Sequence, residues 1–97
     1  MPDTPPFERG LAALEEVLGA AYADRARASS RDPFVEPFTR AATEAVWGGA
    51  WSRDDLDRRT RSLLTLALLV ALSRPEEIRL HVGGALNNGA TREEVRA

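Results

Sequence analysis

The sequence predicts an all-α protein, and three observations support this fold class. Apolar residues recur at spacings of three and four positions, and no segment shows the alternation expected of a strand. Proline, glycine and asparagine stand at intervals suited to beginning and ending helices. The longest apolar run, residues 63–72, is interrupted only by Thr65 and is about half the length of a membrane span. This run therefore predicts a buried core helix.

Length and composition restrict the classes of function. The 97 residues predict a single domain spanning residues 1–97, and the net charge of −2 argues against nucleic acid or an anionic membrane as partner. The chain has no cysteine and one histidine, so we expect no disulfide, no thiol chemistry and no transition-metal site. The N-terminus lacks a signal-peptide pattern, and we expect a cytoplasmic protein.

The first part of the chain predicts two helices in succession. The first covers residues 7–18, with Thr4 as its N-cap and Pro5 at its first position. Gly19 interrupts the pattern, and a second short helix is predicted over residues 20–28.

A third helix is predicted over residues 36–47, after Pro33 and before the pair Gly48 and Gly49. Its apolar residues recur at helical spacing, which predicts one buried stripe. That stripe consists of Phe38, Ala41, Ala42, Ala45 and Val46.

The fourth predicted helix covers residues 54–72, with Ser52 as N-cap and Asp55 as its capping-box partner. Its second half is apolar on all sides. We therefore expect that half to be surrounded by other helices or by a partner subunit.

Two more helices are predicted after the break before Pro75. The fifth covers residues 75–86 and is ended by the Asn-Asn-Gly sequence at residues 87–89. Thr91 then opens a sixth helix as a capping box. Because the sequence ends at Ala97, one turn later, we expect this last helix to be truncated.

The single histidine, His81, is the first candidate for chemistry. In the predicted helix it shares a face with four apolar residues, Ile78, Val82, Ala85 and Leu86. That setting is typical of a core histidine held by hydrogen bonds. It also suits a general acid or base, because histidine titrates near neutral pH. The residues alone leave both interpretations open.

Glu77 lies one turn before His81 on the same face. Its carboxylate is expected to orient the imidazole and raise its pKa, although it could equally be a solvated group at a helix N-terminus, like Glu76. Arg74 directly precedes this helix. Its guanidinium suits a substrate carboxylate, or alternatively caps the preceding helix.

Other arginines are candidates for binding an anionic substrate. Residues 53–61 mix four arginines with three aspartates, a pattern more typical of a solvated face with internal ion pairs. Arg58 in this segment and Arg40 elsewhere are nevertheless predicted to contact substrate. The sequence contains no phosphate-binding glycine loop and no nucleophile elbow, and we expect no cofactor.

Several motifs together resemble the carboxymuconolactone decarboxylase family. They are ERGLAALEEVLG, LDRRTRSLLTLALLVALSR, EEIRLHV, ALNNG and TREEV. The resemblance covers residues 8–95, and RRTRSLLTLALLVAL followed by RLHV and NNG is its most specific part. It implies the all-α fold of the alkylhydroperoxidase-D-like proteins and assembly into a ring of subunits.

The peroxidase branch of that superfamily uses a glutamate, a Cys-x-x-Cys pair and a histidine. In an alignment on His81, the cysteines fall at Arg74 and Glu77 and the glutamate falls at Ser62. Only the histidine is retained, so the chain resembles the decarboxylase branch instead. Gly83 is a departure, because family members commonly carry arginine there.

The resemblance implies cofactor-free decarboxylation of 4-carboxymuconolactone, giving carbon dioxide and 3-oxoadipate enol-lactone in protocatechuate catabolism. His81 and Glu77 would be catalytic, and Arg74, Arg58 and Arg40 would bind the carboxylates of this lactone. Two alternatives stay open. One is a non-catalytic helical oligomerisation module, and the other is a lyase or isomerase acting on a related lactone.

Overall fold

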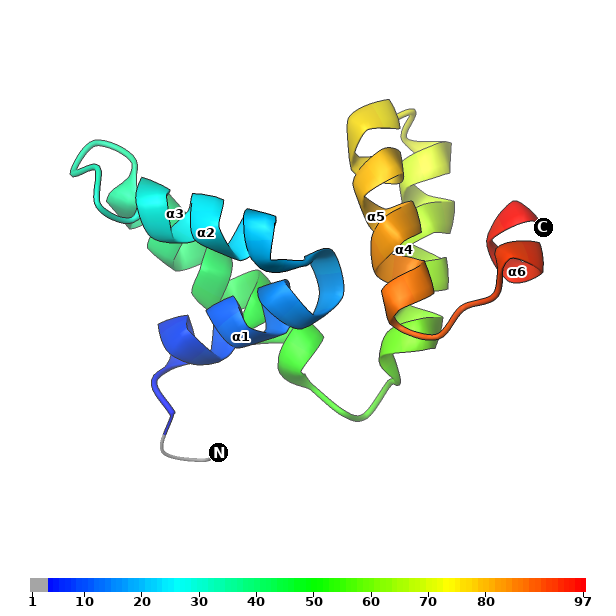
Figure 1. Cartoon of the computed structure of the whole chain (residues 1–97), viewed down its shortest axis with the longest axis horizontal. Helices are drawn as coiled ribbons and strands as arrows, with labels where there is room; N and C mark the ends of the chain where they lie inside the picture. The colour runs from blue at the N-terminus through cyan, green and yellow to red at the C-terminus, as the bar shows by residue number, and fades with distance from the viewer. Residues whose placement is uncertain (1–3) are drawn as a thin grey trace. The chain divides into compact units, whose positions relative to one another are not determined.

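The computed structural model describes residues 4–97, and within them the regular structure is entirely helical (Figure 1). The elements are α1 (Pro6–Leu18), α2 (Ala20–Ser29), α3 (Glu36–Ala42), the π-helical turn η1 (Thr43–Trp47), the 3₁₀ turn η2 (Ala50–Ser52), α4 (Arg58–Ala71), α5 (Pro75–Asn87) and α6 (Arg92–Arg96). This confirms the all-α class. The chain divides into two compact units, residues 1–53 and 54–97, and the prediction of a single domain stays a prediction.

The N-terminal unit is organised around α1, which packs against α2 and η1. The inward face of α1 supplies Ala13 and Val17 to a cluster that also contains Trp51. Trp47 stacks on Trp51, with the ring centroids 5.3 Å apart. Gly19 ends α1 with φ +98°, a conformation that side chains other than glycine rarely adopt. The two aromatic rings and the α1 face therefore form the core of this unit.

Close contact between α1 and η1 depends on Gly10. A Cβ atom on Gly10 would lie 2.9 Å from the Thr43 methyl group and 3.0 Å from the Gly48 nitrogen, and would overlap the Thr43 carbonyl oxygen. Thr43 is itself buried. The absence of a side chain at Gly10 therefore allows the two backbones to approach.

Replacing Gly10 with alanine should destabilise the protein by about 1–3 kcal/mol, because a backbone carbonyl cannot yield as a flexible side chain can. The matched control is Gly83→Ala, since a Cβ there meets nothing within 4 Å. That change should stabilise the helix by about 0.5–1 kcal/mol. Urea denaturation of both variants checks the pair, and equal effects of the two substitutions would contradict this account of Gly10.

The predicted apolar stripe of the third helix is wrong. Phe38 is 68% exposed and Val46 is 44% exposed, whereas Thr43 is 4% exposed. The small threonine occupies the inward position because only a short side chain fits against Gly10. The first helix begins at Pro6, one residue before the predicted start at residue 7, and Pro5 rather than Thr4 is its N-cap.

The C-terminal unit is a hairpin of α4 and α5, which lie side by side (Figure 1). Its buried cluster consists of Leu66, Ala85 and Ala90. The fully buried Ser62 hydroxyl accepts a hydrogen bond from the Asn88 side-chain amide at 2.9 Å, which joins α4 to the end of α5. α5 begins at the predicted Pro75 and ends one residue beyond the predicted boundary.

The fourth helix begins at Arg58 rather than residue 54, and Asp57 rather than Ser52 is its N-cap. The Asp57 carboxylate accepts from the Thr60 amide at 3.0 Å and from its hydroxyl at 2.8 Å. These hydrogen bonds lower the pKa of Asp57. The Ser52 hydroxyl, in the 3₁₀ turn η2, instead donates to the carbonyl of Trp47 at the end of η1, at 2.7 Å. The Asp57 carboxylate therefore caps the start of α4: one oxygen accepts from the Thr60 amide and the other from the Thr60 hydroxyl.

The outer face of α4 is not covered by the other helices of the C-terminal unit. Leu64, Leu68 and Leu72 recur one turn apart, and each is more than half exposed. The other helices of this unit do not surround this half of α4, and the expected alternative of a partner subunit stays a prediction. Within residues 4–97, no helix is both long enough and apolar enough to cross a bilayer.

Candidate functional site

The start of α5 is fixed by a tight reversal after α4. Ser73 adopts a left-handed backbone conformation with φ +56°, and the Arg74 amide donates to the Leu69 carbonyl at 3.0 Å. Arg74 is the N-cap residue of α5, and Pro75 occupies its first turn. The reversal thus places the Arg74 side chain next to the first turn of the helix that carries His81.

Arg74 and Glu77 are brought together as an ion pair. The Arg74 guanidinium donates to Glu77 Oε1 at 2.7 Å, across one turn of helix. The pKa of Glu77 is lowered, first by a hydrogen bond from its own backbone amide and then by Arg74. The carboxylate is therefore charged at neutral pH. Both side chains remain partly exposed, so the pair is accessible to a ligand.

His81 follows Glu77 by four residues on α5 and is half-buried, with its Nδ1 atom shielded from solvent. Burial lowers its pKa because it disfavours the imidazolium, and this outweighs the opposing influence of the Glu77 carboxylate. The Glu77 carboxylate does raise the pKa of His81, as expected, but burial lowers this pKa by more. We call Arg74, Glu77 and His81 the α5 row.

The lowered pKa of His81 predicts a pH-dependent stability. Its ordinary value is 6.5, so below that pH the unfolded chain binds more protons than the folded chain. We expect the free energy of unfolding to fall, relative to that of the non-titrating variant His81→Gln, as the pH drops from about 7 to about 5. Urea denaturation across this range measures the difference, and parallel curves for the two proteins would contradict it.

The structure gives the two other predicted arginines different settings. Arg58 is the first residue of α4 and is half-buried. Arg40 belongs to the N-terminal unit, where it donates to Glu36 at 2.8 Å and lies over the Phe7 ring. The Glu36 hydrogen bond raises the pKa of Arg40. A role for either arginine in substrate binding stays a prediction.

Two features of α4 were not predicted from the sequence. Arg61 has a side chain only 18% exposed, and it lies 3.8 Å from Asp55. The hydrogen bond between Ser62 and Asn88 was also missed. Ser62 does lie one turn before the core residue Leu66, which was the available signal for an inward-facing hydroxyl.

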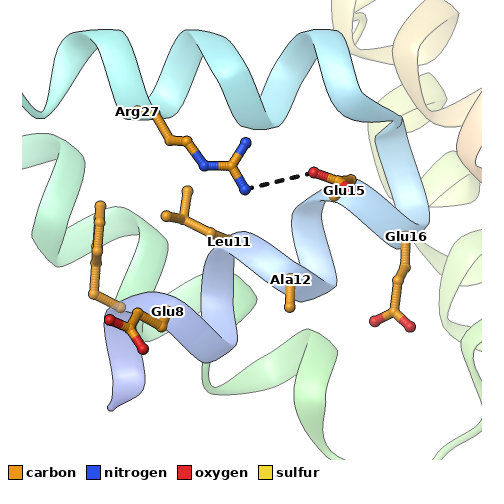
Figure 2. A pocket seen from close by; sticks show the side chains of 7 residues that line it. Glu8, Leu11, Ala12, Glu15, Glu16 and Arg27 are labelled. Carbon is orange, nitrogen blue, oxygen red and sulfur yellow. Dashed lines mark hydrogen bonds and ion pairs between the residues drawn. The ribbon is translucent and has the colours of Figure 1, made fainter. Parts of the chain in front are cut away.

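A cavity of about 630 Å³ in the N-terminal unit is a poor match for an anionic substrate. Figure 2 shows its acidic lining, with Glu8, Glu15 and Glu16 around the apolar Leu11, and with Arg27 paired to Glu15 at 3.5 Å. Three carboxylates against one guanidinium would repel a dicarboxylate. Over residues 4–97, no cluster of three or more potential ligand side chains suits a metal ion.

The all-helical architecture, together with the family and relatives given next, indicates the class of protein. The class is that of the all-α, alkylhydroperoxidase-like enzymes that act as carboxy-lyases. Residues 36–97 match the model of the carboxymuconolactone decarboxylase family, and the chain belongs to this family.

Two similar proteins are both named as decarboxylases. The chain is 38% identical to the 4-carboxymuconolactone decarboxylase of Acinetobacter baylyi over 96 residues, covering 99% of this chain and 71% of that protein. It is 41% identical to the nitrosuccinic acid decarboxylase of Metarhizium robertsii over 90 residues, covering 93% of this chain. The chain spans only 62% of the length of this second relative.

Proposed function

We propose that this protein is a cofactor-free decarboxylase whose substrate is 4-carboxymuconolactone, acting in protocatechuate catabolism. The observation that carries the proposal is the 38% identity to the enzyme of that name over nearly the whole chain. The α5 row supports it, because a guanidinium, a carboxylate and an imidazole follow one another within two turns of one helix.

The chemistry of the two relatives' named substrates supports the absence of a cofactor. When the lactone loses carbon dioxide, the electron pair spreads into the unsaturated ring as a dienolate. In nitrosuccinic acid, the nitro group can accept the corresponding pair. In both cases the substrate is its own electron sink. The protein then has three tasks, which are to bind the carboxylates, stabilise the developing anion and return a proton to carbon.

The residues of the α5 row suit these tasks. Arg74 would bind a substrate carboxylate through its guanidinium, in exchange for part of its contact with Glu77. His81 would supply the proton, oriented by the charged Glu77 one turn away. Arg58, at the start of α4, is a further arginine that we assign to the substrate's carboxylates, and the assignment of Arg40 stays a prediction.

The lowered pKa of His81 fits a proton donor that is charged only when substrate is bound. In the free protein, burial keeps the imidazole neutral at pH 7. A dianionic lactone beside the ring would favour the imidazolium by charge attraction, so the proton would be taken up with the substrate. Loss of carbon dioxide would then leave a carbanion next to an acid ready to protonate it.

We further propose that the protein forms a homo-oligomer in the cytoplasm. The exposed leucines of α4, one turn apart, form an apolar face that a second copy would cover. The absence of cysteine is compatible with a reducing compartment. Size-exclusion chromatography with light scattering would test the oligomer, and a monomer at all concentrations would exclude it.

The test of the function is turnover by the purified protein. Incubation with 4-carboxymuconolactone should release carbon dioxide and form the enol-lactone in equal amounts, without added metal or cofactor. Nitrosuccinic acid should be assayed in parallel, because one relative is named for it. If only nitrosuccinic acid is turned over, that compound replaces 4-carboxymuconolactone as the proposed substrate. A folded protein that turns over neither compound, nor a related lactone, would support a non-catalytic oligomerisation module.

A further inference from the structure

A groove between α5 and α6 combines an apolar floor with two cations. Its cavity of about 380 Å³ is lined by Val82, Leu86 and Val95 together with Arg92 and Arg96. This volume lies within the range of about 300–1,000 Å³ found for small-molecule sites. Apolar side chains with a few converging charges are also the usual lining of such sites.

The short helix α6 is held in place by two contacts, and its own first turn is fixed by a capping box, so the groove is formed before any ligand arrives. Glu94 forms an ion pair with Arg59 of α4. Val95 packs against the buried cluster of the C-terminal unit. At the helix start, the Thr91 hydroxyl accepts from the Glu94 amide while the Glu94 carboxylate accepts from the Thr91 amide. These contacts fix the side of α6 that faces the groove.

The two arginines of the groove lack anionic partners. Among the described residues, neither Arg92 nor Arg96 forms an ion pair or hydrogen bond through its side chain. They lie four positions apart, so both guanidinium groups project from one face of α6, where like charges repel. Of the two acidic residues between them, Glu94 is engaged with Arg59, and Glu93 pairs with neither arginine. An anion between the two guanidinium groups would remove this repulsion.

We propose that the α5–α6 groove binds a small carboxylate with an apolar body, such as a short-chain fatty acid. The carboxylate would lie between Arg92 and Arg96, and the hydrocarbon would cover Val82, Leu86 and Val95. The groove contains none of the residues of the α5 row, and carboxylate binding there does not rest on the proposed decarboxylase activity.

The first experiment is a titration of the whole protein with sodium hexanoate, followed by backbone amide NMR shifts. We expect saturable shifts at Val82, Leu86 and Val95, with hexanol binding several-fold more weakly because it lacks the charge. Each methylene added from butanoate to hexanoate should strengthen binding about fourfold. Equal binding of hexanol and hexanoate, or shifts without saturation, would overturn the proposal.

The second experiment compares variants. Exposed ion pairs contribute about 0.2–1 kcal/mol each, so Arg92→Gln and Arg96→Gln together should weaken hexanoate binding about 2- to 30-fold. The matched control is Arg79→Gln, which removes an exposed arginine of α5 that does not line the groove. If the control weakens binding as much as the double variant, the effect is one of net charge and the site is refuted. Binding that persists in His81→Gln would show that the site is separate from the proposed chemistry.

Discussion

Replacing His81 with glutamine should lower kcat for 4-carboxymuconolactone by about 10²- to 10⁴-fold, the usual contribution of a positioned general acid. Glutamine is close to histidine in volume and keeps a hydrogen-bonding group, so the half-buried position should stay filled. The protein should therefore remain folded while proton return to carbon fails. Steady-state kinetics, with urea denaturation of the same sample, separates the loss of chemistry from a loss of stability.

The control for this experiment is Arg79→Gln, an exposed position on the same helix that contributes to neither proposed site. Its kcat should match that of the wild type. If His81→Gln instead keeps near-wild-type turnover, His81 is a structural residue of the hairpin and the assignment of the acid is wrong. If neither the wild type nor the variant turns over substrate, the proposed function itself fails.

Replacing Arg74 with glutamine should lower kcat/KM by about 10- to 100-fold, because a hydrogen bond to a charged group contributes about 1.5–3 kcal/mol. The Arg74 guanidinium lies at the start of α5 and donates a hydrogen bond to Glu77. Its removal would also release the Glu77 carboxylate from its ion pair. The loss should fall mainly on KM if Arg74 binds the ground-state carboxylate and on kcat if it stabilises the developing anion.

The matched variant for this prediction is Glu76→Gln, which removes a charge beside the row without touching the Arg74–Glu77 hydrogen bond. We expect little change in kcat/KM for Glu76→Gln. Equal losses in Glu76→Gln and Arg74→Gln would indicate a general electrostatic effect at the helix N-terminus. An unchanged kcat/KM in Arg74→Gln would remove Arg74 from the proposed site.

The sequence determined most of the helical architecture because its signals are local. Pro75 begins α5 as expected, and the Asn-Asn-Gly sequence at residues 87–89 was correctly predicted to end it. The capping box of α6 forms with both reciprocal hydrogen bonds. The order along α5 of a guanidinium, a carboxylate and an imidazole was also readable, because helical spacing alone brings Glu77 to within one turn of both neighbours.

The tertiary structure decided the features that the spacing of residues along the sequence cannot predict. Which face of the third helix is buried depended on the close approach of Gly10 to Thr43, a contact between segments far apart in the sequence. The hydrogen bond from Asn88 to Ser62 likewise joins residues 26 positions apart. The direction of the His81 pKa shift required a comparison of burial with the charge of Glu77, and burial is a property of the packed hairpin. Local chemistry therefore fixed the elements and their candidate residues, whereas packing fixed their faces, their partners and their protonation.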